Sequence, residues 1–167
     1  LTIKSSRLPD NADRIRIVQI SDVHIGQIVR ERRIAAILDL VKAASPDILV
    51  STGDLVDGHQ RHFNGLEHLF LEVKPKLGKY AIVGNHEYYV GIAEAEKFMM
   101  NAGFKVLRNE NFELGGLISI SGVDDARNKT ARKANAVIEE KLLDSSPQGV
   151  FRLLLIHRPV VEKSSVG

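Results

Sequence analysis

The sequence has no cysteine and no tryptophan, and only 5% of its 167 residues are aromatic. The absence of cysteine excludes disulfides, thiol catalysis, zinc–thiolate sites and iron–sulfur clusters. No stretch approaches the roughly 18 apolar residues of a membrane-spanning helix, so none is expected within this span. Lysine and arginine total 23 and aspartate and glutamate 21, a net charge of +2. So small an excess does not favour a nucleic-acid or membrane surface.

Hydrophobic residues make up 44% and charged residues 26%, which is typical of a globular domain with a sizeable core. Short apolar runs alternate with segments of helical periodicity, and a Gly-Gly pair indicates a hairpin. This order predicts an α/β fold with a largely parallel core sheet. The expected strands are Ile15–Ile20, Asp47–Thr52, Lys79–Val83, Phe112–Leu114, Leu117–Ser121 and Phe151–Ile156; the expected helices are Glu31–Ala44, Phe63–Val73, Gly91–Asn101 and Lys129–Leu143.

Four of the apolar strands run directly into polar segments. Ligands of α/β sheets bind outside the carboxyl ends of the strands, so these segments should meet in one crevice. The side chains expected there are Asp22, His24, Asp54, Asn85, His86 and His157.

The residue types in this crevice are typical of a metal site. Carboxylate and amide oxygens together with imidazoles suit zinc, iron and manganese, and the lack of sulfur favours hydrolytic over redox chemistry. On an extended segment, Asp22 and His24 would point the same way and could grip one ion. A lone Asp-x-His is usually surface; the hypothesis rests on several motifs occurring in order, each at a strand end.

The motifs Asp22-Val-His24, Gly53-Asp54-Leu-Val-Asp57, Gly84-Asn85-His86-Glu87 and His157-Arg-Pro159 together resemble the calcineurin-like metallophosphoesterase superfamily, and finer features are similar to its bacterial, often membrane-associated branch. The resemblance implies an α/β fold: a four-layer α/β/β/α sandwich of two mixed sheets. We expect residues 1–167 to form a single domain of this kind, truncated at its C-terminal end.

The resemblance also implies ligand roles for two metal ions, Mn, Fe or Zn. Asp22 and His24 would hold the first ion, and Asn85 and His157 the second. Asp54 would bridge the two ions.

Two further residues would act in catalysis according to the resemblance. His86 would lie beside the phosphate and stabilise the transition state or protonate the leaving oxygen, with Glu87 orienting it. Asp57 would support its loop. The superfamily's Gly-His-x-His motif does not follow His157, so the chain alone is expected to be an inactive portion.

The leading hypothesis is a metal-dependent phosphoesterase that hydrolyses a phosphomonoester or phosphodiester with metal-activated water. The alternatives are a non-catalytic metal-binding or scaffold module and a nuclease of the same superfamily. The expected partner is a small phosphoester; nucleic acid is not favoured. Membrane association would require a segment outside this chain, and bacterial cytoplasmic and membrane-associated locations both remain open. Asp124 and Asp125 are interpreted as a tight turn or helix cap.

Overall fold

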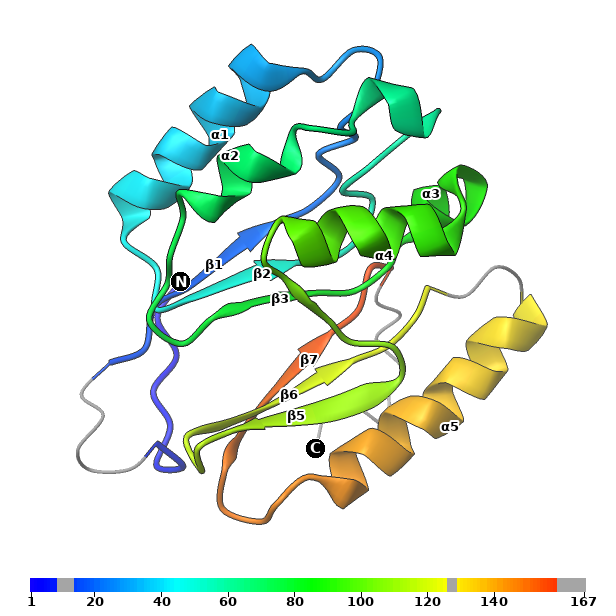
Figure 1. Cartoon of the computed structure of the whole chain (residues 1–167). Helices are drawn as coiled ribbons and strands as arrows, with labels where there is room; N and C mark the ends of the chain where they lie inside the picture. The colour runs from blue at the N-terminus through cyan, green and yellow to red at the C-terminus, as the bar shows by residue number, and fades with distance from the viewer. Residues whose placement is uncertain (9–13, 126–128, 159–167) are drawn as a thin grey trace.

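The computed structural model describes residues 1–8, 14–125 and 129–158. Within these ranges, seven strands form two sheets (Figure 1). The first sheet has the order β1-β2-β3-β4 and is parallel throughout; in the second, β6 pairs antiparallel with β5 and parallel with β7. The strands are β1 (Ile17–Ile20), β2 (Ile48–Ser51), β3 (Lys79–Ala81), β4 (Lys105–Val106), β5 (Glu110–Leu114), β6 (Ile118–Gly122) and β7 (Phe151–Leu155).

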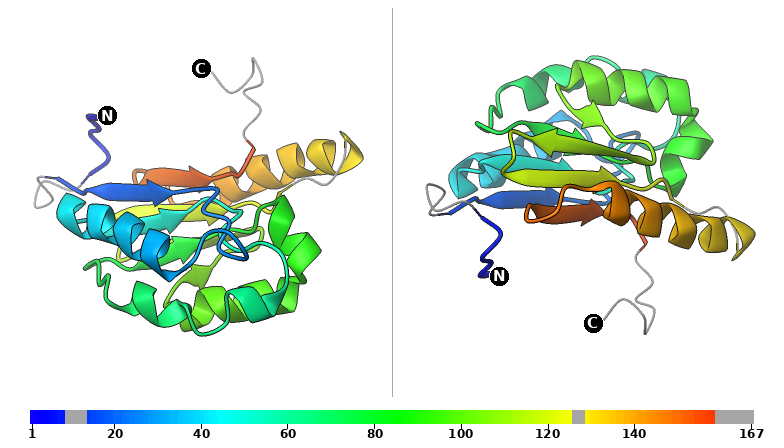
Figure 2. Two further views of the ribbon diagram at one scale, coloured as in Figure 1. Left: turned by 90° about the horizontal axis from the view of Figure 1, so that it is seen from above. Right: turned by 90° about the horizontal axis from the view of Figure 1, so that it is seen from below.

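Helices cover the outer faces of both sheets. In Figures 1 and 2, α1, α2 and α4 lie on the first sheet, and α5 lies on the far side of the second. None of the described helices is long and apolar enough to cross a membrane. The helices are α1 (Glu31–Ala44), α2 (Glu67–Leu71), α3 (Asn85–Val90), α4 (Ile92–Asn101) and α5 (Lys129–Ser145), with a short 3₁₀ turn, η1 (Gln60–His62).

Alternation along the strands divides the apolar residues between two cores. On β2, Leu49 packs with the helices while Ile48 and Val50 face the second sheet, because successive side chains point to opposite faces. On β6, Ile118 and Ile120 complete the core between the sheets. The α/β layers agree with the sandwich that the resemblance implies, but the first sheet is parallel rather than mixed, as the strand–helix alternation predicts.

Polar side chains on the outer face of the second sheet hydrogen-bond to α5 and to the residue that follows it. Ser119 Oγ donates to Ser146 Oγ at 3.2 Å, and Asn111 Nδ2 donates to the Leu142 carbonyl at 2.8 Å. The serine positions alternate with the buried isoleucines of β6. These contacts explain why the apolar face of this sheet turns inward.

The helix expected over Phe63–Val73 is wrong as one continuous element. η1 ends before Phe63, and α2 begins only at Glu67. Gly65 has φ +88, a left-handed conformation that ends a helical path. Phe63 and Phe70 still pack edge-to-face on Phe98, with ring centroids 5.4 and 6.2 Å away, so the helical periodicity correctly marked core residues.

The sequence pattern also missed α3 and β4. The polar segment after β3 was given no secondary structure by the sequence pattern, and it forms the short helix α3. β4 is only two residues long, too short for periodicity to reveal.

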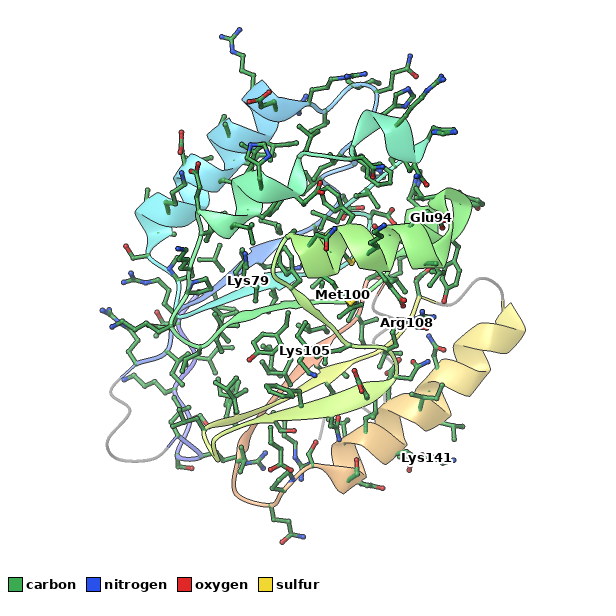
Figure 3. All side chains as sticks on the ribbon, viewed as in Figure 1. Lys79, Glu94, Met100, Lys105, Arg108 and Lys141 are labelled. Carbon is green, nitrogen blue, oxygen red and sulfur yellow. The ribbon has the colours of Figure 1, made fainter. Side chains whose placement is uncertain are left out.

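Lys79 ties the helical layer to the sheet. Its buried Nζ donates to the carbonyls of Phe70 and Ala102, at 2.7 and 2.6 Å. These carbonyls lie at the ends of α2 and α4, where helices lack intrahelical donors. Figure 3 shows Lys79 beneath this layer.

Candidate metal centre

The carboxyl ends of four strands supply the candidate site. Asp22 and His24 follow β1, Asp54 follows β2, His86 lies in α3 directly after β3, and His157 follows β7. Their side chains, with that of Asp57, form two groups of three. Within each group, one potential ligand atom from each residue lies within 4.8 Å of those of the other two. The two groups are the buried triad, Asp22, Asp54 and His157, named for its buried Asp54–His157 pair since Asp22 itself is exposed, and the outer triad, His24, Asp57 and His86.

The buried triad is centred on Asp54, which is 3% exposed. His157 Nδ1 lies 2.8 Å from the Thr52 carbonyl, and a carbonyl only accepts, so Nδ1 donates and Nε2 is left for the centre. His157 Nε2 lies 3.3 Å from Asp54 Oδ2. The hydrogen bond to Asp54 raises the pKa of His157 to about 9 despite burial. Burial alone would raise the pKa of Asp54, but hydrogen bonds from His157 and His86 hold it below its usual value.

The outer triad is partly exposed and has two histidines. His86 Nδ1 lies 2.9 Å from Asp57 Oδ1, and this hydrogen bond raises the pKa of His86. His24 lies between the two carboxylates, with Nε2 3.9 Å from Asp54 Oδ2 and Nδ1 3.5 Å from Asp57 Oδ2. The Nδ1 atom of His24 is buried and makes no hydrogen bond within the described residues.

Three of these residues have left-handed backbone conformations. The φ angles of Asp22, His24 and Asp54 are 53°, 52° and 52°, a region that few non-glycine residues adopt and in which functional sites are enriched. The backbone N–H groups of Asp22 and His24 donate to the carbonyls of Gly53 and Asp54, at 3.1 and 3.0 Å. The expected extended Asp22-x-His24 segment is therefore wrong, and its two side chains fall into different triads.

Two glycines allow the strand-end loops to approach this closely. A Cβ on Gly84 would overlap Asp54 Oδ1, and a Cβ on Gly53 would lie 2.8 Å from His157 Nδ1. Asn85 follows Gly84 as the first residue of α3 and is half-buried. The next N–H, that of His86, donates to Asp54 Oδ1 at 2.9 Å. Asn85 thus begins α3 beside Asp54.

Glu87 and Asp57 make the reverse of the expected contacts. The Glu87 carboxylate is fully buried and accepts four backbone N–H groups at 2.7–3.1 Å. Within the described residues, the carboxylate hydrogen-bonded to the His86 ring is that of Asp57 rather than Glu87. Burial raises the pKa of Glu87 although its hydrogen bonds oppose this. The four donors are the N–H groups of Asp54, Leu55, Val56 and Gly84.

Asp57 is the site residue that sequence reasoning assigned only to loop support. Ile25 and Val56 form a parallel bridge, and the Asp57 N–H donates to the Ile25 carbonyl at 2.8 Å. This pairing brings Asp57 beside His24. The sequence feature that could have indicated Asp57 is its place as the second carboxylate of Gly53-Asp54-Leu-Val-Asp57. Whether that carboxylate faces the site, however, depends on how the loop pairs with a distant segment. Pro159 of the fourth motif lies outside the described residues.

A cavity of about 410 Å³ opens beside the outer triad. Tyr89 forms one wall; it is 81% exposed, and its ring lies edge-on to His86 with centroids 5.7 Å apart. Glu94, another lining residue, lies near the start of α4 (Figure 3). The lining residues are Asp57, Gly58, His59, Gln60, Tyr89, Val90 and Glu94.

Comparison with known proteins identifies the family. The sequence model of the calcineurin-like phosphoesterases matches residues 15–166, nearly the whole chain. This chain belongs to the calcineurin-like phosphoesterase family. An uncharacterized metallophosphoesterase of Aquifex aeolicus is 36% identical over 99% of this chain and 63% of its own length. The uncharacterized metallophosphoesterase YkuE of Bacillus subtilis is 31% identical over 95% of this chain and 56% of its own length.

Membership of this phosphoester hydrolase superfamily confirms the resemblance at the level of the family. A zebrafish transmembrane protein with a metallophosphoesterase domain is 28% identical over 98% of this chain and 39% of its own length. The chain thus spans less than two thirds of these relatives. The two His/Asp triads are consistent with the dinuclear metal centre that the sequence predicts.

Proposed function

We propose that this chain carries the catalytic core of a metal-dependent hydrolase of phosphomonoesters or phosphodiesters. The observation that carries the proposal is the position of Asp54. Its Oδ2 atom lies 3.3 Å from His157 Nε2, 3.9 Å from His24 Nε2 and 4.0 Å from His86 Nε2. A buried carboxylate among three imidazoles is poised to be shared between cations.

The donor set fits metal ions better than an arrangement of ion pairs alone. Among the residues that the structure describes, none hydrogen-bonds to the buried His24 Nδ1, and a buried polar atom left unsatisfied is costly unless a ligand completes it. We assign Asp22, His24, Asp54, Asn85 and His157 as the residues that would hold two divalent ions. Ions bound there would supply activated water and neutralise charge on the phosphoryl group.

His86 is assigned to proton transfer. Its Nδ1 donates to Asp57, which raises the pKa of His86 and favours the protonated ring. Its Nε2 is directed towards the centre, 4.0 Å from Asp54 Oδ2. From Nε2, His86 can donate a proton to the oxygen of the leaving group, as a positioned general acid does. Asp57 acts through His86 by fixing its orientation and protonation.

The cavity beside Asp57 would receive the leaving group. Asp57 belongs both to the outer triad and to the cavity wall, so a phosphoester at the centre could extend its alcohol moiety into this space. The exposed Tyr89 ring and Val90 provide apolar surface, while His59, Gln60 and Glu94 provide polar groups. Such a mixed lining orients a small organic group.

The proposal is tested with the full-length protein, stripped of metal by a chelator and reloaded with Mn²⁺, Fe²⁺ or Zn²⁺. We expect hydrolysis of an aryl phosphomonoester or phosphodiester that the chelator abolishes and at least one ion restores. Asp54→Asn should remove it, whereas Asp39→Asn, a change to an exposed aspartate on α1, should leave it intact. Metal binding without turnover of any phosphoester would overturn the proposal in favour of the non-catalytic module.

A further inference from the structure

Two neighbouring aspartates, interpreted from the sequence as a turn, each bind an arginine. Arg108 Nε lies 2.8 Å from both carboxylate oxygens of Asp124, and its Nη2 lies 2.6 Å from Oδ2. Arg158 Nε donates to Asp125 Oδ1 at 2.8 Å, and its Nη2 donates to Asp125 Oδ2. Both arginine–aspartate pairs are bidentate, which fixes the plane of each guanidinium.

The first pair belongs to the framework of the fold. Arg108 also forms an ion pair with Glu96 of α4 at 2.5 Å, and the Tyr88 hydroxyl donates to Asp124 at 3.3 Å. Figure 3 shows Arg108 between α4 and the second sheet. With two carboxylates around it, this guanidinium links elements of the fold to one another.

The second pair lies at the candidate metal centre. Arg158 directly follows His157, whose Nε2 lies 3.3 Å from Asp54 Oδ2, and the negative charge of Asp54 helps to raise the pKa of Arg158. The Arg158 side chain is 44% exposed, whereas the Asp125 side chain is 3% exposed. A carboxylate buried this deeply is costly unless a cation and hydrogen bonds compensate it, so Asp125 keeps Arg158 at the edge of the centre.

Asp125 is itself anchored to the loop that carries Asn85 and His86. Its N–H donates to the Val83 carbonyl at 3.3 Å, directly before Gly84. The orientation of Arg158 is therefore set by the same loop that supplies candidate site residues. A half-exposed guanidinium held from behind by a buried carboxylate is preorganised to bind an anion in front of it.

We propose that Arg158 binds non-bridging oxygens of the phosphoryl group at the candidate centre and that Asp125 positions it. The inference rests on the proposed function, which puts a phosphoester at this place. A planar guanidinium matches the oxygens of a phosphoryl group in a way that an ammonium does not. Arg158 is then a substrate-binding residue, and Asp125 is a positioning residue.

The test is calorimetric titration of inorganic phosphate into the Mn²⁺-loaded full-length protein. We expect Arg158→Met to weaken phosphate binding about 10- to 100-fold, the range of hydrogen bonds to charged groups, with the manganese content unchanged. Arg158→Lys should recover only part of the affinity. Arg108→Lys is the matched control in the framework pair, and it should lower thermal stability while leaving phosphate affinity unchanged.

A double-mutant cycle tests the positioning role. Asp125→Asn should weaken phosphate binding in the wild-type background and add nothing when Arg158 is already methionine; additive losses would contradict positioning. Equal phosphate affinity in Arg158→Met and wild type, loss of manganese in that variant, or no phosphate binding by the wild type would overturn the inference. If the wild type binds phosphate through Arg158 but hydrolyses no phosphoester, the inference stands and the proposed function fails.

Discussion

The two triads contain similar residues in different environments. The buried triad holds Asp54 against His157 at 3.3 Å, with both side chains 4% exposed. In the outer triad, His24 and His86 are each 32% exposed and Asp57 is 41% exposed. Desolvation strengthens electrostatic interactions in the first, whereas solvent and the adjoining cavity moderate them in the second.

This difference separates binding from proton transfer. A buried carboxylate needs a compensating positive charge, which suits Asp54 of the buried triad for holding cations. A partly exposed histidine beside a cavity can exchange a proton with substrate, which suits His86 of the outer triad for acid catalysis, whereas His24 of the same triad is assigned to the ions. Asp54 connects the two, since its Oδ2 lies near a histidine of each triad.

Replacing His86 should separate the roles of the two triads most clearly, because it should lower kcat without lowering the metal content. In His86→Gln, we expect kcat to fall about 100-fold, the lower end for loss of a general acid, with the metal content unchanged. Steady-state kinetics and metal analysis of the same preparation measure both quantities. His68→Gln, which alters an exposed histidine on α2, is the control. Loss of bound metal in His86→Gln would make His86 a ligand instead and break the division.

Glu87 supports the loops of both triads, so its replacement should act on stability. A glutamine can accept at only one side-chain atom, and its amide group would face two of the four backbone donors that Glu87 satisfies. We expect Glu87→Gln to lower the free energy of unfolding by about 3 kcal/mol, because buried backbone donors would lose their hydrogen bonds to a charged acceptor. Denaturant unfolding measures it, with exposed Glu31→Gln on α1 expected to change little. Equal effects of the two changes would contradict this support.

Asp57 should control the protonation of His86 without controlling metal binding. Because its hydrogen bond is the main cause that raises the pKa of His86, removing its charge in Asp57→Asn should lower that pKa. The acid form would then be lost at lower pH, so the alkaline limb of the kcat profile should move to lower pH. Asp39→Asn should not move it. An unchanged limb would show that His86 is not the titrating acid.

The smallest expected effect concerns the metal-free protein. The pKa of His157 is raised from 6.5 to about 9 by Asp54, so the folded state holds this proton more tightly than the unfolded chain. The resulting stabilisation is complete below pH 6.5 and is lost as pH rises through about 9. In chelator, the Tm of wild type should fall more over this range than that of His157→Gln. If the Tm of the two proteins fell equally with pH, the result would contradict the pairing of His157 with Asp54.

The sequence predicted the elements that local patterns determine. Helix α1 begins at Glu31 and ends at Ala44 as its periodicity indicates, and the strands preceding the site lie where apolar runs place them. The choice of polar strand-end residues was also informative, because parallel strands deliver their carboxyl ends to one edge. These features depend on short stretches of chain.

The pairing within the site could not be predicted from the same patterns. The positive φ angles of Asp22 and His24 accompany hydrogen bonds to the loop after β2, which is distant in the sequence. Glu87 follows His86 on α3, and neighbouring side chains on a helix do not face each other, so Glu87 turns into the core. Arg158 stands in the His157-Arg-Pro159 motif but received no role from the sequence, because its contact with Asp125 joins the segment after β7 to the distant segment after β6.

The central claim is that Asp54 joins two cation sites, and manganese stoichiometry tests it most directly. Mn²⁺ titrated into the metal-free full-length protein should bind at two ions per chain. In Asp54→Asn, both should weaken together, because the shared carboxylate is lost, while Asp39→Asn should bind as wild type does. A single ion in the wild type, or unchanged binding of both ions in Asp54→Asn, would contradict the account.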